Sequence, residues 1–514
     1  MRIKSLMLIF LLGAFPLHAQ DNVVAPKVYL NIVVDQLRTD FLYEFYSLYG
    51  EGGFKKLLAG GRVYPNSYFA FENVDRASAA ATLATGTDPY VSGIVGEQWL
   101  DRKSMRVVSC VEDRKFDGHF TTLSFAPTKL KAITLADEMK RASRGGAIIC
   151  SIAPDEDVAV INGGHAADMV LWKNNAAGFW SSSSYYGEFP AWAVEINRTT
   201  QESSRKWEPL LSSLDYNYYG EKAPPRFSYG FKGRIDMKKY KTTACINEEV
   251  TEVAMAYIRE SKIGRDDMAD CLSLSFYAGN VNGDDMESRP VEVQDMYARL
   301  DRHIAAIISE LENRVGADRL VVSLSSTGYV MESGEDGAKY RLPSGIIYMD
   351  RIMVLMNVYL SAIYGKGEYV DGVHAQQFYM NNKLIEDMKL DKHAVVSHAI
   401  EFLKSVDGVE DVFTIYNLGG MLSPDLQYVK NGYNSSCSGD IWLRLMPGWK
   451  VVRSSLTSSS DKYRTPVMFP MVIYGTGVKA DVVEEITPAN MLAVELARIL
   501  RVRRPNDNCL RVFK

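Results

Sequence analysis

The chain has 514 residues, of which 47% are hydrophobic and 24% are charged, and its formal net charge is −5 at pH 7. This composition is typical of a folded globular protein and excludes a largely disordered chain. A mildly acidic protein lacks the basic surface that nucleic acids require, so we expect no nucleic acid partner. The length predicts two or three domains, or one large domain with insertions.

The first twenty residues predict a secretory signal peptide. Arg2 and Lys4 precede an apolar run over residues 6–15, and the tripeptide LHA that follows is a plausible cleavage site. Removal of this segment takes away two positive charges, which gives a mature net charge of −5 − 2 = −7. We therefore expect an exported protein in the periplasm or outer envelope of a Gram-negative bacterium, with no transmembrane segment after cleavage.

Six cysteines would then enter an oxidising compartment. Cys150 and Cys271 lie in apolar, strand-like runs and are predicted to be buried thiols. The other four lie near predicted loops and are candidates for one or two disulfides, with the pairing left open by the sequence: Cys110, Cys245, Cys437 and Cys509.

Strand-like and helix-like segments alternate along the chain. A β-branched strand over residues 28–35 precedes a helical stretch, and later helical segments each come before or after an apolar strand. This alternation predicts a mostly parallel sheet with helices on both faces, whose ligand crevice lies at the carboxyl ends of the strands. Asp35 lies at such an end. The other predicted segments are helices 41–61, 131–143, 246–262, 291–315 and 487–502, and strands 145–153, 271–278, 319–326 and 467–475.

Two stretches interrupt the alternation, and we interpret both as insertions that build a cap beside the sheet. The predicted organisation is a signal peptide (1–20), core (21–164), cap insertion (165–240), core (241–344), second cap insertion (345–440) and core (441–514). The first insertion is rich in aromatic residues that would line a groove or form the core of the cap: Trp172, Trp180, Tyr185, Tyr186 and Trp192.

Several motifs carry a family resemblance, among them "VVDQLRTDF", "ATLATGTDPYVSGIVGEQW", "GGHAADMVLW" and "RTPVMFPMVIYGTGV". With these motifs the chain resembles the alkaline phosphatase superfamily in its type I phosphodiesterase/nucleotide pyrophosphatase branch. It looks most like the exported Bacteroidota alkaline phosphatases that use a threonine nucleophile. The resemblance implies an α/β alkaline-phosphatase-like fold, and phosphoryl transfer at two zinc ions.

Most of the family's catalytic positions are changed in this sequence. Arg76 in "DRASAAATLATG" stands where the resemblance places the threonine nucleophile, and Glu97 stands where it places a phosphate-binding asparagine. Asp155 and Asp157 stand in place of a phosphate-binding lysine and arginine. A carboxylate repels a phosphate dianion and cannot donate a hydrogen bond to it, so these changes predict a loss of phosphate binding.

The metal-binding positions are changed as well. Of six ligands that the resemblance implies, only Asp35 is kept, and no histidine occurs in residues 454–463, where the last family histidine should lie. Hydroxyl and amide groups do not hold Zn²⁺ as imidazole and carboxylate do, so we expect no cofactor. One Mg²⁺ or Ca²⁺ on Asp35 and neighbouring acids is the alternative. The other former ligand positions hold Asn280, Asp284, Ser326 and Thr327.

Two functional hypotheses follow. The first is an exported pseudoenzyme that binds or scaffolds an unidentified protein or envelope partner. The second is an active metal-dependent phosphomonoester or phosphodiester hydrolase with a rebuilt site, with Ser78 or Thr82 as the nucleophile and a hard cation on Asp35 and Asp284. In the first case we expect Asp35 to be satisfied by Arg76, by Thr327 or by backbone amides.

Overall fold

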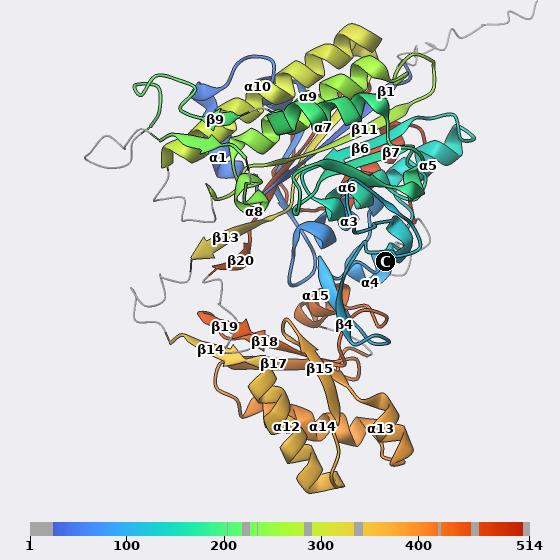
Figure 1. Ribbon diagram of the computed structural model, residues 1–514, viewed down its shortest axis with the longest axis vertical. Coiled ribbons are helices and arrows are strands. Elements are labelled where there is room, and N and C mark those ends of the chain that lie inside the picture. Colours follow the sequence, from blue (N-terminus) through green and yellow to red (C-terminus); the bar gives the residue numbers. More distant parts are fainter. Residues whose placement is uncertain are drawn as a thin grey trace, which may run out of the picture.

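The fold is built on one large mixed sheet. The computed structural model describes residues 24–202, 204–217, 227–233, 235–281, 290–333, 343–419, 423–453 and 462–506, so the predicted signal peptide lies outside the described residues. The sheet has eleven strands in the order β22-β2-β21-β12-β1-β11-β6-β7-β8-β5, and β23 also pairs with β2 (Figure 1). Within it, β8 and β21 run opposite to β1, and the other strands run with it. The expected mostly parallel α/β sheet is therefore confirmed.

The strands of this sheet have the following bounds: β1 (Val28–Asp35), β2 (Arg62–Tyr68), β5 (Gly118–His119), β6 (Ile149–Ala153), β7 (Met169–Lys173), β8 (Trp180–Ser183), β11 (Asp270–Tyr277), β12 (Leu320–Ser326), β21 (Phe469–Gly475), β22 (Asp481–Val482) and β23 (Thr487–Pro488). The apolar run of the β21 segment predicts a strand, but β21 pairs antiparallel with both β12 and β2. An apolar run is buried equally well in either direction, so the pattern carries no information on orientation.

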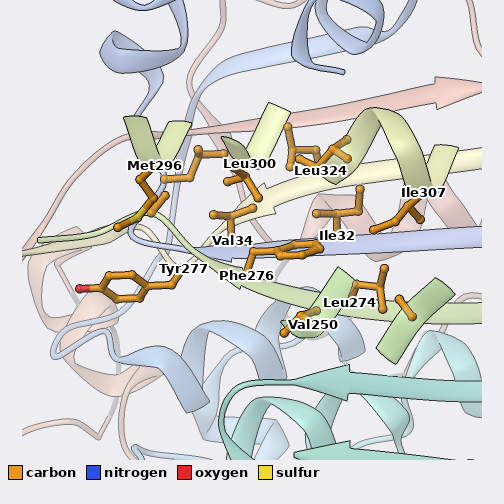
Figure 2. Close-up of a cluster of buried hydrophobic side chains, with 14 of the residues drawn as sticks. Ile32, Val34, Val250, Leu274, Phe276, Tyr277, Met296, Leu300, Ile307 and Leu324 are labelled. Atoms are coloured by element: carbon orange, nitrogen blue, oxygen red, sulfur yellow. The ribbon is translucent and has the colours of Figure 1, made fainter. Parts of the chain in front are cut away.

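β1 lies at the centre of the sheet because its side chains are apolar on both faces. Val28, Leu30, Ile32 and Val34 are fully buried under one layer of helices, while Tyr29 and Val33 are buried under the other. Figure 2 shows Ile32 and Val34 packed with side chains from the neighbouring strands and from the covering helices. Burial on both faces explains why the strand is a continuous hydrophobic run rather than an alternating one.

The helices form two layers over the sheet. α2 (Phe54–Gly60), α9 (Ala244–Glu260) and α10 (Pro290–Val315) bury apolar side chains on the first face. α3 (Arg76–Thr85), α5 (Leu135–Ala142) and α16 (Met491–Ile499) do so on the second, and α6 (Glu156–Gly163) packs against α3 and β7. Further helices are α1 (Thr39–Glu44), α4 (Pro89–Ser92), α7 (Ala191–Glu202), α8 (Met237–Tyr240) and α15 (Pro424–Asn431).

A second unit with its own hydrophobic core lies beside the main sheet, at the lower end of Figure 1. It contains a four-stranded sheet in the order β15-β16-β18-β17 and the pair β14-β19. Arg102 of the main unit donates to Asp440 of this unit over 2.8 Å, which ties the two together. Its elements are β14 (Gly345–Tyr348), α12 (Met349–Tyr364), β15 (Val370–His374), β16 (Gln377–Met380), α13 (Asn382–Asp387), α14 (Lys392–Lys404), β17 (Val409–Thr414), β18 (Ile441–Leu445) and β19 (Trp449–Val452).

Both predicted insertions need a correction. The first was expected at residues 165–240, yet its opening segment supplies β7 and β8 to the central sheet, where Trp172 and Trp180 are buried. The expected cap aromatics at these two positions are therefore core residues of the sheet. The second was expected to end at residue 440, but β18 and β19 extend this unit to Val452. Two-stranded pairs complete the fold: β3 (Gln98–Asp101) with β4 (Arg106–Ser109), β9 (Arg205–Trp207) with β10 (Tyr229–Phe231), and β13 (Tyr329–Ser333) with β20 (Lys462–Pro466).

Five of the six cysteines are described, and all five are buried free thiols: Cys110, Cys150, Cys245, Cys271 and Cys437. Cys509 lies outside the described residues. The candidate disulfides among the other loop cysteines are thus absent from the described part of the chain. In the same part, every helix is too short or too polar to cross a membrane.

The end of β11 is held by a side chain from α9. The Asn247 amide donates to the Tyr277 carbonyl over 2.7 Å and accepts from the Tyr277 N–H over 2.8 Å. Asn247 is fully buried, so it replaces a strand partner at the point where the sheet edge opens.

Substitution of Asn247 by Ala should destabilise the fold strongly, because it leaves two buried backbone groups of Tyr277 without partners. We expect the free energy of unfolding to fall by about 2–4 kcal/mol, as measured by urea denaturation. Asn66 makes one exposed hydrogen bond to the Glu484 carbonyl and provides the matched control. Equal effects of Asn66→Ala and Asn247→Ala would contradict the assignment.

Candidate functional site: a partly buried ion-pair cluster at the sheet edge

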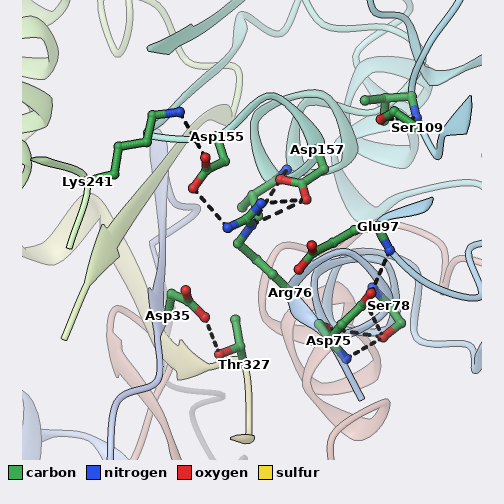
Figure 3. Close-up of polar contacts among 12 residues, drawn as sticks. Asp35, Asp75, Arg76, Ser78, Glu97, Ser109, Asp155, Asp157, Lys241 and Thr327 are labelled. Atoms are coloured by element: carbon green, nitrogen blue, oxygen red, sulfur yellow. Dashed lines mark hydrogen bonds and ion pairs between the residues drawn. The ribbon is translucent and has the colours of Figure 1, made fainter. Parts of the chain in front are cut away.

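Asp35 lies where the carboxyl ends of three parallel strands meet. In the register of the sheet it stands beside Tyr277 of β11, and the preceding residue Val34 stands beside Ser326 of β12. The Thr327 hydroxyl donates to Asp35 over 2.7 Å and accepts from the Gln36 N–H over 2.9 Å (Figure 3). Of the partners expected for Asp35, the structure thus provides Thr327.

Arg76 begins helix α3, directly opposite this edge. The helix forms readily because its sequence is rich in alanine, and its small side chains allow close packing against α6. Asp75 caps it: its carboxylate accepts from the Ser78 N–H over 2.9 Å, and Ser78 in turn accepts from the Asp75 N–H over 3.0 Å. This reciprocal cap fixes the first turn of α3, and with it the backbone that carries Arg76.

The guanidinium of Arg76 is held between two carboxylates from α6. It donates to Asp157 from Nε and Nη2 over 3.1 and 2.9 Å, and its Nη1 lies 3.0 Å from Asp155. Asp155 is the residue before α6 and Asp157 lies in its first turn, where a helix favours negative charge. Lys241 donates to the other oxygen of Asp155 over 2.9 Å. Figure 3 shows these four side chains linked from α3 to the segment that follows α8.

The expected ion pair between Asp35 and Arg76 is therefore wrong. Both side chains line the same cavity, but the guanidinium contacts Asp155 and Asp157 instead. A bidentate contact with one carboxylate and a further contact with a second satisfies a planar guanidinium better than a single acid at the strand end does.

The pKa values follow from burial and charge together. Burial raises the pKa of Asp157 to about 6, even though Arg76 opposes that shift. Burial acts in the same direction on Asp155, but Arg76 and Lys241 outweigh it and lower the pKa of that carboxyl. The surrounding acids raise the pKa of Arg76 well above its usual value. Arg76 thus stays charged at neutral pH.

A second ion pair lies at the wall of the cleft between the two units. Arg464 of β20 donates to Glu97 over 2.7 Å. The Glu97 backbone N–H donates to Asp75, the cap of α3. Burial raises the pKa of Glu97, while Arg76 and Arg464 pull it back. Glu97 is therefore occupied as an ion-pair partner.

The hydroxyl groups of both candidate nucleophiles donate hydrogen bonds within α3 and its cap. The Ser78 hydroxyl is fully buried and donates to the Asp75 carboxylate over 2.8 Å. The Thr82 hydroxyl is buried and donates to the Ser78 carbonyl over 3.0 Å, as helical threonines commonly do. Neither hydroxyl lines the cavity beside Asp35.

The remaining former ligand positions serve the local backbone. Asn280 donates to the Met331 carbonyl, and the Ser326 hydroxyl accepts from the Gly328 N–H over 3.4 Å. Asp284 lies outside the described residues. Asp35 and Thr327 are thus the two positions of this set that the described structure brings together at the strand ends.

These residues do not fit a pair of zinc ions. The cavity between Asp35, Arg76 and Lys241 measures about 20 Å³, and a single water needs roughly 10–15 Å³. Two of its lining groups are cations, which repel a metal ion. In the described part of the chain, no three His, Cys, Asp or Glu side chains are arranged to hold a metal.

Two members of the cluster are not predicted from the sequence. Lys241 lies in "MKKYKTT", where neighbouring lysines give the same signal and only the fold selects the one that reaches Asp155. Arg464 lies in the motif "RTPVMFP", which predicts family membership but does not identify Glu97 as its partner.

The chain is similar to known proteins in both sequence and fold. The family model for "Type I phosphodiesterase / nucleotide pyrophosphatase" matches residues 29–468. The chain belongs to this family. Its curated family relatives include a protein named "Calcium-transporting ATPase" from Myroides odoratus, 27% identical over 96% of this chain and 95% of that protein. Another is alkaline phosphatase PafA from Elizabethkingia meningoseptica, 26% identical over 95% of this chain and 93% of that one.

Solved structures show the family fold. The crystal structure of wild-type alkaline phosphatase PafA superposes with a TM-score of 0.78, at 24% identity, over 94% of this chain and 97% of that chain. A murine ectonucleotide pyrophosphatase/phosphodiesterase 5 structure gives a TM-score of 0.51 at 12% identity. The alkaline-phosphatase-like fold implied by the motifs is thereby confirmed.

Loss of Arg76 should be costly, because it leaves two carboxylates of the cluster without their main partner. We expect Arg76→Met to lower the free energy of unfolding by roughly 3 kcal/mol. The double variant with Asp157→Asn should recover most of that loss, since Asp155 keeps Lys241 and residue 157 is then neutral. Urea denaturation of both variants measures this. Arg498, in a more exposed pair with Glu495, is the control, and Arg498→Ala should change stability little.

His165 is a structural residue of the family motif "GGH". Its Nδ1 lies 2.9 Å from Asp137, and its Nε2 lies 2.9 Å from the Leu130 carbonyl. Both contacts are satisfied when both ring nitrogens carry protons. The hydrogen bond to Asp137 raises the pKa of His165.

The raised pKa predicts a pH-dependent contribution of His165 to stability. The contribution is complete below the unfolded pKa of about 6.5 and is lost as the pH rises through the higher folded value. Thermal unfolding between pH 5.5 and 8.5 should therefore show a decline that is reduced in His165→Gln, which cannot titrate. An unchanged profile in this variant would contradict the role.

Proposed function

We propose that this protein is a catalytically silent member of the family, exported to the cell envelope, where it binds or scaffolds a partner. The observation that carries the proposal is the position of Arg76. Its guanidinium fills the space between the N-termini of α3 and α6 and is held there by Asp155 and Asp157. An internal ion pair then takes the place of a bound anionic substrate.

The electrostatics of the cluster support this proposal. It holds five carboxylates (Asp35, Asp75, Glu97, Asp155 and Asp157) and three cations (Arg76, Lys241 and Arg464), which gives −5 + 3 = −2 when all are charged. A phosphate dianion that approached the sheet edge would meet net negative charge. The site thus repels the substrates that its relatives' names imply.

The available hydroxyls support it as well. Nucleophilic attack requires a hydroxyl that reaches the substrate and a base that takes its proton. Ser78 already donates to its own helix cap, and Thr82 to a carbonyl inside the helix. Activity through Ser78 would require the first turn of α3 to open, and activity through Thr82 would require its hydrogen bond inside the helix to break.

Metal content and turnover, measured on the mature chain, test the proposal. We expect no stoichiometric zinc, magnesium or calcium, and no hydrolysis of a phosphomonoester, a phosphodiester or a nucleotide pyrophosphate above the level of a heat-denatured sample. The assay includes added Zn²⁺, Mg²⁺ and Ca²⁺, so that loss of metal during purification is not mistaken for inactivity.

Asp35→Ala is the variant that decides between silent protein and rebuilt enzyme. Metal-dependent turnover that disappears in Asp35→Ala but persists in Arg498→Ala would show that a hard cation on Asp35 supports hydrolysis, and the proposal would be wrong. Turnover that is equal in Asp35→Ala and in the unmodified chain would instead identify a contaminating hydrolase.

A further inference from the structure

Helix α12 of the second unit presents an apolar face to solvent. One side of the helix packs on β15 and α14, where Met356 and Leu360 are fully buried. On the opposite side, Val354, Leu355 and Val358 are 57%, 53% and 64% exposed. A helix that is apolar on both sides is normally buried on both sides. Exposed apolar patches on a folded protein mark interaction surfaces.

The exposed face of α12 has the spacing of a coiled-coil seam. Arg351, Leu355, Val358 and Ala362 follow one another at steps of four, three and four residues, and all four are exposed. Residues at alternating steps of three and four lie along one side of a helix. These four residues, the α12 stripe, therefore form a seam against which a second helix can pack. Val354 widens the stripe on one flank.

The α12 stripe is complementary to itself. Its steps read four, three and four in both directions, so an antiparallel second copy of α12 meets it layer by layer. Leu355 then lies level with Val358 of the partner subunit, and the long Arg351 lies level with the small Ala362 of the partner subunit. Every such contact occurs twice, as in the isologous interface of a two-fold symmetric dimer.

Charge favours the antiparallel pair over the parallel one. A helical side chain leans toward the N-terminus of its own helix, and the Arg351 guanidinium does so, because it lies over the Tyr348 ring, 4.8 Å from the ring centroid. In an antiparallel pair this direction leads to the C-terminal end of the partner helix, where free carbonyls attract a cation. In a parallel pair the two Arg351 side chains would lie side by side and repel each other.

The position and composition of α12 also favour a second copy as the occupant. The helix lies at the lower end of Figure 1, away from the main sheet, so the main units of two joined copies would lie away from the contact. A lipid surface is a poorer match. Interfacial membrane helices are rich in lysine and arginine, whereas Arg351 is the one basic residue of α12 and Asp350 stands beside it.

We propose that the α12 stripe is the contact surface of a symmetric, antiparallel homodimer of this protein. Sixteen residues make a helix about 24 Å long. A single helix pair of this length buries less than the roughly 1,200–2,000 Å² of stable complexes, so the dimer is weak and depends on concentration. The inference does not rest on the silent site, because no residue of α12 lines the cavity beside Asp35.

Sedimentation equilibrium of the mature chain tests the dimer. We expect monomer at about 1 μM and a growing share of dimer toward about 500 μM. Val358→Glu places carboxylates in the two middle layers and should weaken association at least tenfold. Val194→Glu is the matched control, since Val194 is an exposed helical valine on α7 of the main unit. Absence of dimer in the unmodified chain, or equal association in Val358→Glu, would overturn the proposal.

Two further measurements test the orientation and the occupant. Arg351→Ala should weaken an antiparallel dimer at least threefold, because two contacts with helix C-termini are lost; stronger association in this variant would indicate a parallel pair and refute the assignment. Co-sedimentation with phosphatidylethanolamine/phosphatidylglycerol vesicles tests lipid. A chain that stays monomeric and binds vesicles through Val358 but not Val194 would make lipid the occupant and also refute it. None of these readouts involves hydrolysis, so they stand apart from the test of the silent site.

Discussion

The guanidinium of Arg76, held between two carboxylates, is the interaction on which the site depends. Helix α3 supplies the cation and helix α6 supplies the anions, so the pair fixes both helix N-termini at the sheet edge. Buried pairs of this kind add little net stability, since desolvation offsets their attraction. While all partners are present, the cluster changes the free energy of unfolding little. Removal of one partner destabilises the protein, because it leaves another charge unpaired.

The main features of the fold could be predicted from the sequence. The β1 run is apolar on both faces and ends at Asp35, and the structure places that strand at the centre with the same bounds. The periodic segments of α9 and α10 likewise form helices. Burial explains these successes, because a strand covered on both sides and a helix covered on one side have different and recognisable patterns.

The failures have physical reasons too. Residues 165–240 were assigned to a cap because this stretch is rich in aromatic residues, yet β7 and β8, which lie in it, extend the sheet by pairing with β6 and β5. The prediction placed Arg76 at the correct edge of the sheet but paired it with Asp35 instead of Asp155 and Asp157. Charge pairing depends on which side chain reaches across 3 Å, and that distance is set by the fold rather than by local sequence. Lys241 and Arg464 were missed for the same reason.

The charge pairing between α3 and α6 also limits how the chain could change. Replacement of Arg76 by a small hydroxyl residue would leave Asp155 with Lys241 alone and Asp157 without a cation. Replacement of either aspartate by a basic residue would place two cations side by side. Each single substitution leaves a charge without its partner, so these positions constrain one another and tolerate change only as a set.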